Sequence, residues 1–407
     1  MSLMTSFRHR ETNVERPHRI GIVGTGFIGK GLVMALECHQ DLVPSAVLTR
    51  TNIGHRNDFP RQDLLTNSIA KLVDSSDIVV ECSGDVIHAT SVIQRVIEAS
   101  LPVVTMDADF HVTTGSYFAR RGFITEAEGD QPGCLAALKE DVEQMGFEPL
   151  VYGNIKGFLN HNPTPEEMHF WAAKQNLSLQ MTTSFTDGTK IQIEQALVAN
   201  GLGADIATPG LLGIASEDVY SGAQALADRA RALGCRISDY VLSSKAPPGV
   251  FIVAEHDIRQ QAHLRNFKLG DGPYYILLRN YHLCHLEIAK TIRRVLGGGG
   301  ELLNNGTNPK ISVSAVAKKT LQPGHLIERG IGSFDVRGTT VRIAESPEHV
   351  PIGLLTNATV LRRIEPGQLL RFDDVEMADS LALRAWCEIA QGPPKTSLVP
   401  NTTPTTG

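Results

Sequence analysis

A lysine lies between two carboxylates in the segment TDGTKIQIEQ, residues 186–195. Asp187 precedes Lys190 by three positions, and Glu194 follows it by four. If the segment is helical, Lys190 and Glu194 share one face, because side chains four residues apart are neighbours on a helix. A lysine with a lowered pKa can both donate a proton and hold an oxygen that gains negative charge. The alternative interpretation is an exposed ion pair on a helix surface.

Two further segments place charged groups beside glycines. In GNIKG (153–157) the glycines free the backbone around Lys156, so its ammonium is a second candidate proton donor or an anion cradle for a substrate phosphate or carboxylate. In EGDQPG (128–133) Glu128 and Asp130 lie just ahead of an expected helix. A carboxylate there either caps the helix or takes a catalytic or metal-binding role, and the sequence leaves both open.

The segment YHLCHLE (281–287) contains four residue types that bind metals. The surrounding residues alternate as in a strand, which would place His282 and Cys284 on one face and His285 and Glu287 on the other. These four side chains would then not converge on one ion. We therefore expect histidines that line a sheet or a substrate pocket, and no metal centre at this segment.

A glycine-rich run, HRIGIVGTGFIGKGL (18–32), shows where a cofactor would bind. Apolar β-formers read as a buried strand, and the apolar spacing then changes to that of a helix. Three glycines stand at the junction. The first permits a tight turn, the second lets the backbone approach a pyrophosphate, and the third lets the helix pack on the strand. The run predicts a dinucleotide site.

The second expected strand ends in AVLTRTN (46–52), which has an arginine and two threonines but no acid. An acid at this place typically binds the ribose of NAD, whereas the fork of donors on Arg50 suits the 2′-phosphate of NADP. An ordinary solvated arginine is the alternative. Residues directly after another strand, in SSDIVVECSG (75–84), also face the expected ligand. The predicted cofactor-binding residues are Gly24, Thr25, Gly26, Phe27, Ile28, Gly29, Arg50, Ser83 and Gly84.

Strands and helices alternate over the first part of the chain, which predicts an α/β fold with a Rossmann doubly wound parallel sheet. A middle part with helices and strands follows, and the glycine-rich segment 296–309 has the composition of a linker. The expected divisions are an extension at 1–17, a dinucleotide-binding domain at 18–160, an α+β substrate and dimerisation domain at 161–296, a linker at 297–309, a small β module at 310–391 and a disordered tail at 392–407.

The small β module is expected because of an internal repeat. KKTLQPGHLI (318–327) recurs 43 positions later as LRRIEPGQLL (361–370). Pro-Gly fixes a tight turn, so two similar turns predict an all-β module with internal pseudo-symmetry. The tail beyond it is rich in proline and threonine and has too little apolar surface to fold.

The bulk composition excludes several classes of partner. The 407 residues carry 38 Lys and Arg against 44 Asp and Glu, a net charge of −6, which favours neither nucleic acid nor an anionic membrane. The N-terminal segment lacks the apolar core of a signal peptide, and no apolar stretch approaches the roughly 18 residues that span a bilayer. Six cysteines without paired spacing suit reduced thiols. We expect a cytoplasmic protein without disulfides.

Over nearly its full length the chain resembles the homoserine-dehydrogenase-like oxidoreductases, in the branch that carries a C-terminal SAF domain, a β-clip module. The matching stretches are GIVGTGFIG, ECSGD, AEGDQPG, GNIKG, TSFTDGTK, LGDGPYY and YHLCHLE, followed by the Pro-Gly repeat. Lys190 matches the helix lysine of that group. True homoserine dehydrogenases carry a lysine just past the strand that ends here at Met106, where this chain has Asp107 and Asp109, so homoserine is a poor candidate substrate.

The resemblance implies an NADPH-dependent oxidoreductase that acts on a small polyhydroxylated, phosphorylated keto compound. One type in this branch converts 1-deoxy-D-xylulose 5-phosphate to 2-C-methyl-D-erythritol 4-phosphate, a reductoisomerisation. Dehydrogenation of a sugar acid or amino-acid-like alcohol, and non-catalytic binding of NADP and a sugar, are the alternatives. A rearrangement would need a base or a divalent ion, and the carboxylates of Glu128, Asp130, Asp187 and Glu194 suit Mg²⁺ or Mn²⁺. We expect a homodimer.

Overall fold

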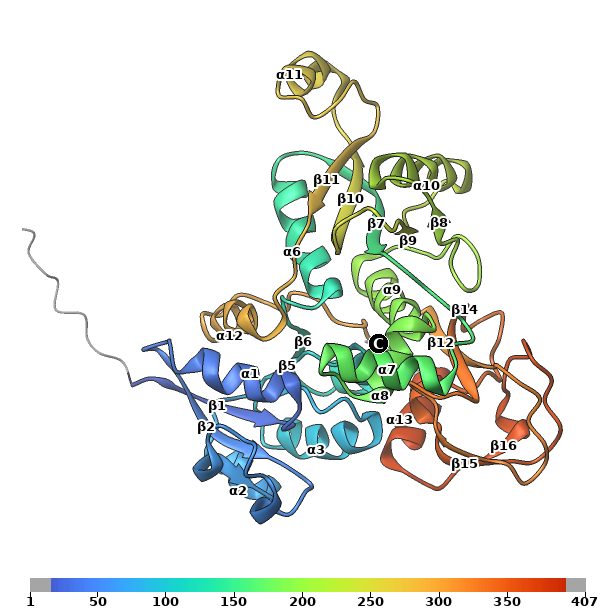
Figure 1. Ribbon diagram of the computed structural model, residues 1–407. Coiled ribbons are helices and arrows are strands. Elements are labelled where there is room, and N and C mark those ends of the chain that lie inside the picture. The colour runs from blue at the N-terminus through green and yellow to red at the C-terminus, as the bar shows by residue number, and fades with distance from the viewer. Residues whose placement is uncertain (1–15, 393–407) are drawn as a thin grey trace, which may run out of the picture.

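The computed structural model describes residues 16–392, which form two sheet domains and a smaller C-terminal region (Figure 1). The first sheet has six strands in the order β3-β2-β1-β4-β5-β6, and every pairing in it is parallel. The predicted Rossmann sheet is thereby confirmed. Its strands are β1 (His18–Val23), β2 (Leu42–Leu48), β3 (Leu65–Thr66), β4 (Ile78–Glu81), β5 (Val103–Thr105) and β6 (Ile124–Glu126).

Helices cover both faces of this sheet. Successive strand residues point to opposite faces, so the strands present apolar side chains to the helices on each side. Ile20 and Ile78 pack in a cluster with residues of α1 and α12, whereas Val79 packs with residues of α2 and α3. The helices of this part are α1 (Phe27–Leu36), α2 (Ile69–Asp74), α3 (Val86–Glu98), α4 (Ala108–Phe110), a π-helical turn (His111–Gly115), α5 (Ser116–Ala119) and, much later in the chain, α12 (Ile288–Leu296). The next helix along the chain, α6 (Gln131–Gln144), packs on the second sheet.

The second sheet is mixed and runs in the order β11-β10-β7-β9-β8. Helices α6 and α9 pack on one face, and α10 covers the other. The strands are β7 (Glu148–Lys156), β8 (Ile214–Ala215), β9 (Ile237–Leu242), β10 (Gly249–Glu255) and β11 (Tyr275–Arg279); the helices are α7 (Pro165–Gln175), α8 (Leu179–Thr186), α9 (Thr189–Leu202), α10 (Val219–Leu233) and α11 (Gln261–Asn266). Because β7 pairs with β9 and β10, the first domain ends before residue 148, earlier than the predicted boundary at 160.

The strand expected through residues 281–287 is wrong. β11 ends at Arg279, and Cys284–Leu286 form a single 3-10 turn in which Cys284 has a φ of +46°. The Leu283 N–H donates to Glu287 Oε2 at 2.8 Å, and the Cys284 N–H donates to the Gly129 carbonyl. These bonds stabilise a turn, and the segment does not take the extended conformation that its alternating pattern predicts.

The C-terminal region contains two small antiparallel sheets, β12-β14 and β13-β15-β16. The two repeated turns pair with each other, since Leu321 and Ile364 exchange backbone hydrogen bonds. Gly324 and Gly367 have φ of +84° and +83°, so both Pro-Gly turns have the same geometry. The elements are β12 (Ile311–Ala317), β13 (Leu326–Arg329), β14 (Val336–Arg342), β15 (Thr356–Val360), β16 (Val375–Glu376) and α13 (Leu381–Gln391).

The range 310–391 is not all-β as predicted, because it ends in α13. Trp386 on this helix is buried, and Ile87 of α3 and Tyr117 of α5 pack against its cluster. The C-terminal region is therefore fastened to the first domain by an apolar contact. The predicted tail lies outside the described residues, apart from Gly392, and the predicted N-terminal extension is described only from residue 16.

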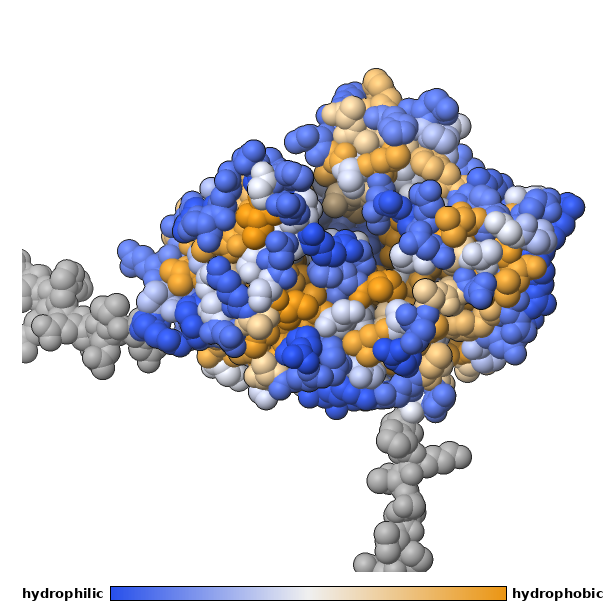
Figure 2. All heavy atoms as spheres, turned by 90° about the horizontal axis from the view of Figure 1, so that it is seen from below, coloured by the Kyte–Doolittle hydropathy of each residue, from blue (hydrophilic) through white to orange (hydrophobic). Residues whose placement is uncertain are grey.

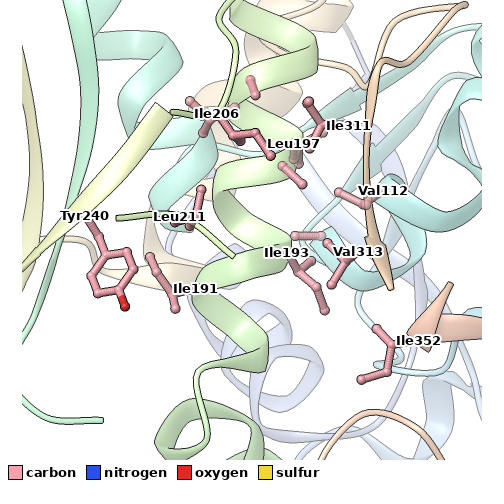
Figure 3. Packing of buried hydrophobic residues seen from close by; sticks show 14 of the residues in the cluster. Val112, Ile191, Ile193, Leu197, Ile206, Leu211, Tyr240, Ile311, Val313 and Ile352 are labelled. Atoms are coloured by element: carbon pink, nitrogen blue, oxygen red, sulfur yellow. The ribbon is translucent and has the colours of Figure 1, made fainter. Parts of the chain in front are cut away.

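Helix α9 is the centre of the molecule's largest apolar cluster (Figure 3). Ile193 and Leu197 pack with Val112 from the first domain and with Ile311 and Val313 from the C-terminal region. All three regions thus meet on one helix. On the face shown in Figure 2, hydrophilic residues are interspersed with groups of hydrophobic residues. No described helix is long and apolar enough to cross a membrane.

Candidate active site

The glycine-rich turn between β1 and α1 leaves room for a ligand. Gly24 has a φ of +116°, and a Cβ there would meet the Cys82 carbonyl oxygen at 2.7 Å. A Cβ on Gly29 would lie 2.2 Å from the Gly24 carbonyl oxygen, so this glycine lets α1 pack against the turn. A Cβ on Gly26 would meet nothing within 4 Å. The open face lies at the N-terminus of α1, where free N–H groups suit a pyrophosphate.

A cavity of about 550 Å³ lies in front of this turn. It reaches from the first domain to α8 and α9, and Lys190, Asp107 and Asp109 are part of its wall. The predicted cofactor-binding residues that line it are Thr25, Gly26, Phe27, Ile28, Ser83 and Gly84. Six of the nine residues predicted for the cofactor therefore share one cavity with the lysine predicted for catalysis, whereas Gly24, Gly29 and Arg50 do not line it.

Lys190 belongs to the first turn of α9. Its Nζ lies 3.6 Å from Asp109 Oδ1 and 3.7 Å from Asp130 Oδ2, and its side chain is only 14% exposed. Both distances are longer than a normal hydrogen bond. The two carboxylate oxygens are buried and have no hydrogen-bond partner within the described part of the chain. The ammonium is thus held by charge and remains free to donate to a substrate oxygen.

The electrostatic setting of Lys190 differs from our expectation. Burial lowers the pKa of this lysine, but the net pKa lies well above the usual value because of four carboxylates, those of Asp109, Asp130, Glu194 and Asp107. The expected lowered pKa is therefore wrong. The side chain is an ammonium at neutral pH, and it can stabilise negative charge on an oxygen as well as donate a proton.

Asp107 is a buried acid in the cavity wall. Its Oδ1 accepts N–H groups of Asp109 and Phe110 at 3.1 and 3.2 Å, while Oδ2 has no partner among the described residues. Burial and the neighbouring Asp109 carboxylate raise the pKa of Asp107 to about 7. The sequence signals for this residue are its place shortly after a strand of the parallel sheet and the departure from the homoserine dehydrogenase pattern at this position.

Ser83 is positioned by a carboxyl group beneath it. Its N–H and hydroxyl both donate to Glu81 Oε1, at 2.8 and 2.6 Å, and the Thr105 hydroxyl donates to Oε2 at 3.2 Å. Glu81 is completely buried, and this burial raises its pKa. The loop that lines the cavity at residues 83 and 84 is therefore anchored by side-chain hydrogen bonds from two strands.

Glu194 and Lys156 form a closed set one turn further along α9. Lys156 Nζ lies 3.0 Å from Glu194 Oε2, and Asn154 Nδ2 donates to the same oxygen at 2.9 Å. Burial raises the pKa of Glu194, and the Lys156 ammonium opposes that rise. Neither residue lines the 550 Å³ cavity. Their predicted catalytic roles stay predictions, and the contacts describe a paired lysine and carboxylate beneath the site.

Asp187, also predicted as a catalytic residue, does not line the cavity. Its side chain is fully buried, with Oδ1 accepting the Thr189 N–H at 2.8 Å and Oδ2 lying 2.6 Å from the Lys318 Nζ. Burial raises the pKa of Asp187 and lowers that of Lys318, and the attraction within the pair opposes both changes. The structure thus gives Asp187 an ion-pair partner in the C-terminal region, 131 positions away.

The carboxylates considered as metal ligands do not converge. Asp130 caps α6 by accepting the Gln131 N–H at 3.0 Å, and Glu128 pairs with Arg279 at 2.8 Å and Lys290 at 2.7 Å. Across residues 16–392, no group of three or more His, Cys, Asp or Glu side chains could hold a metal ion. The residues present do not fit the Mg²⁺ or Mn²⁺ considered from the sequence.

Arg50 lies at a second cavity, of about 540 Å³, beside β2. The wall includes Asn52, Asn67 and His88, and no carboxylate belongs to it. Arg50 pairs with Asp85 at 2.8 Å, and its side chain is 61% exposed. The position after β2 agrees with a site for the adenosine end of a dinucleotide.

Two family models match the chain. Residues 24–117 match the NAD-binding domain of homoserine dehydrogenase, and residues 129–288 match the catalytic domain of oxidoreductase DRL. The first range holds every predicted cofactor-binding residue, and the second holds Asp130, Lys156, Asp187, Lys190 and Glu194. No curated protein matches the chain in a sequence search.

Solved dehydrogenase structures are similar to part of the chain. UDP-N-acetylglucosamine 3-dehydrogenase from Acidithiobacillus ferrooxidans is 12% identical, covers 71% of this chain and 92% of its own, and has a TM-score of 0.38. A probable dehydrogenase from Thermotoga maritima is 10% identical, with 70% and 91% covered and a TM-score of 0.42. A putative myo-inositol dehydrogenase from Sinorhizobium meliloti is 12% identical, with 70% and 90% covered and a TM-score of 0.37.

Proposed function

The protein is an NAD(P)-dependent oxidoreductase, and we propose that it interconverts a ketone and an alcohol on a small polyhydroxylated compound bound beside Lys190. One observation carries this proposal. Lys190 is a charged group in the wall of the cavity that begins at the glycine-rich turn, and its distances to Asp109 and Asp130 leave its N–H bonds free for a substrate.

Lys190 supplies the polar half of the reaction. The glycine-rich turn at Gly26 would hold a reduced nicotinamide cofactor, which would supply the hydride for the carbonyl carbon. As that carbon is reduced, the oxygen gains negative charge, and the Lys190 ammonium stabilises this charge and transfers one proton to it. Asp109 and Asp130 keep the ammonium in place and favour its return to the charged form.

The free oxygens of the site favour a substrate with several hydroxyl groups. Asp107 and Asp109 line the cavity, and Asp107 Oδ2 and Asp109 Oδ1 are buried acceptors without a hydrogen-bond partner in the described part of the chain. Buried acceptors are stabilised by donors, and substrate hydroxyls are suitable donors. A sugar acid, a keto sugar or its phosphate has this chemistry.

Reductoisomerisation of 1-deoxy-D-xylulose 5-phosphate is the second candidate function. Asp107 favours it, because a buried carboxyl with a pKa of about 7 can accept a hydroxyl proton before the reduction. The resemblance of the chain to the reductoisomerase-like branch supports the same candidate. We further propose NADP as the preferred cofactor, since the cavity beside β2 has Arg50 in its wall and no carboxylate.

The proposal is tested by following the loss of NADPH absorbance with purified protein. The substrates are 1-deoxy-D-xylulose 5-phosphate and a panel of keto sugars and oxidised sugar acids, each with and without Mg²⁺ or with a chelator. We expect turnover that Lys190→Ala loses and that Lys139→Ala retains, since Lys139 of α6 is half-buried, pairs with Glu143 and does not line the cavity. NADPH binding without turnover on any of these compounds would contradict the proposal and favour a non-catalytic binding protein.

A further inference from the structure

The C-terminal region makes direct contacts with the helix that carries Lys190. The Gly338 N–H of β14 donates to Thr189 Oγ1 at 2.9 Å, and the Thr340 N–H donates to Gln192 Oε1 at 2.8 Å. Thr189 and Gln192 flank Lys190 in the first turn of α9. The position of that turn is therefore set in part by a strand that belongs to neither sheet domain.

Lys318 adds a charged contact to the same turn. Its Nζ lies 2.6 Å from Asp187 Oδ2 and 2.5 Å from the Ser333 carbonyl oxygen, and its side chain is 5% exposed. Asp187 in turn accepts the Thr189 N–H. One ammonium thus joins the start of α9 to the loop that follows β13. A buried pair of this kind holds its partners firmly, because losing one partner leaves an uncompensated charge.

The loop joined by Lys318 reaches the cavity. Ile331 lines the cavity together with Gln180 of α8. Gly332, with a φ of +71°, packs so closely that a Cβ would lie 2.3 Å from the Gln180 carbonyl oxygen, and Arg329 donates to Gln180 Oε1 at 2.8 Å. The loop and α8 form one wall, and Ser333 connects that wall to Lys318.

The internal repeat shows that the turn itself does not require this lysine. Lys318 corresponds to Leu361 in the second copy, and Lys319 corresponds to Arg362. Leu361 is 52% exposed, whereas Lys318 is buried against Asp187. The glycines of the two Pro-Gly turns have nearly the same positive φ with either residue. The burial of a lysine at position 318 is therefore explained by its ion pair with Asp187 and not by the Pro-Gly turn.

We propose that Lys318 is a positioning residue: through Asp187 and Ser333 it fixes both the first turn of α9, and hence Lys190, and the cavity wall at Ile331. This inference rests on the proposed function of Lys190. It assigns the C-terminal region a part in the active site, because without that region the cavity lacks one wall and the catalytic helix lacks an anchor.

The test compares Lys318→Met with Lys319→Met. The two variants remove the same charge from adjacent positions, but Lys319 is 54% exposed and pairs with Asp335 at the surface. We expect Lys318→Met to lower kcat about 100-fold, the effect of a displacement of about 1 Å at a catalytic group, with the NADPH Kd unchanged. Lys319→Met should retain the kcat of the parent protein.

Hydrogen exchange gives a readout that needs no substrate. In Lys318→Met, peptides covering residues 187–195 and 329–335 should exchange faster than in the parent protein, and in Lys319→Met they should not. Faster exchange in a protein that turns over no compound would support the anchor and contradict only the proposed function. Parent-like exchange and kcat in folded Lys318→Met would overturn the inference.

A double variant covers the case in which Lys318→Met does not fold. Asp187→Asn combined with Lys318→Met removes both buried charges, and the new amide oxygen can still accept the Thr189 N–H. We expect this protein to fold with a Tm near that of the parent and with kcat still reduced, because the link to Ser333 is absent. Full recovery of kcat would overturn the inference. The loss of kcat in Lys318→Met would then be due only to the unpaired Asp187 carboxylate.

Discussion

Helix α9 carries two lysine and carboxylate groupings one turn apart, and they differ in how completely they are paired. Glu194 has two donors within 3.0 Å, from Lys156 and Asn154. Lys190 lies 3.6 and 3.7 Å from its two carboxylates. In the first grouping the lysine and the carboxylate are paired at hydrogen-bonding distance, whereas in the second the lysine and its carboxylates have kept donors and acceptors for a ligand. The comparison teaches that incomplete pairing, more than the presence of a lysine, identifies the group available to a substrate.

Removing Lys190 tests the incompletely paired grouping and has the largest expected effect. Lys190→Met should lower kcat/KM about 10⁴-fold, because one group serves as proton donor and as stabiliser of the oxygen. The NADPH Kd, measured by fluorescence titration, should stay unchanged. Lys139→Met is the matched control. A variant that retains most of its kcat/KM would refute the role of Lys190 and with it the comparison.

Asp107 extends the comparison to an acid that has no cation within hydrogen-bonding distance. Its pKa is about 7 in the folded protein against 3.8 in the unfolded chain. Between these values the folded protein holds a proton that the unfolded chain releases, so the free energy of unfolding falls as the pH rises from 4 to 7. A shift of this size corresponds to about 4 kcal/mol as an upper value.

Asp107→Asn should remove this pH dependence and raise the free energy of unfolding at pH 8 by up to about 4 kcal/mol. Urea unfolding at pH 5 and pH 8 measures both quantities, and Asp109→Asn, which removes one of the two causes of the raised Asp107 pKa, should weaken the pH dependence. If the difference between the two pH values is the same in Asp107→Asn as in the parent protein, Asp107 does not hold a proton near neutral pH.

Breaking the closed grouping should affect stability more than chemistry. Lys156→Met leaves the Glu194 carboxyl buried without its cation, and we expect a loss of about 3 kcal/mol in the free energy of unfolding. The double variant Lys156→Met with Glu194→Gln should recover most of that loss, because no unpaired charge remains. A kcat loss in the double variant as large as that of Lys190→Met would show that the two groupings do not differ in function.

The sequence predicted the local parts of this site. The glycines that need a positive φ or a close approach, the strand-end positions and the helical spacing of Lys190 depend on neighbours within a few residues. The repeat was also readable, and the paired turns at Leu321 and Ile364 confirm it. These features follow from short-range sterics and periodicity, which a single sequence records.

Long-range pairing could not be predicted in the same way. The partner of Asp187 is Lys318, 131 positions away, and no local pattern connects them. The raised pKa of Lys190 depends on Asp109 and Asp130, which arrive from two other segments. The alternation at 281–287 looked like a strand, yet the Glu287 carboxylate folded it into a turn. Each of these outcomes depends on which distant groups the fold brings together.

The smallest expected effect concerns Arg50, at the far end of the expected cofactor site. Like Lys190, Arg50 is a cation whose pairing leaves it available to a ligand. Arg50 is paired with Asp85 at 2.8 Å but is 61% exposed, so water weakens the pair and the guanidinium can be released to a phosphate. Arg50→Ala should raise the NADPH Kd about tenfold, or about 1.4 kcal/mol, and leave the NADH Kd unchanged. Arg61→Ala, an exposed arginine paired with Asp63, is the control. Equal weakening of both cofactors would assign Arg50 to the ribose or the protein surface, and equal affinities in the parent protein would exclude a preference for NADP.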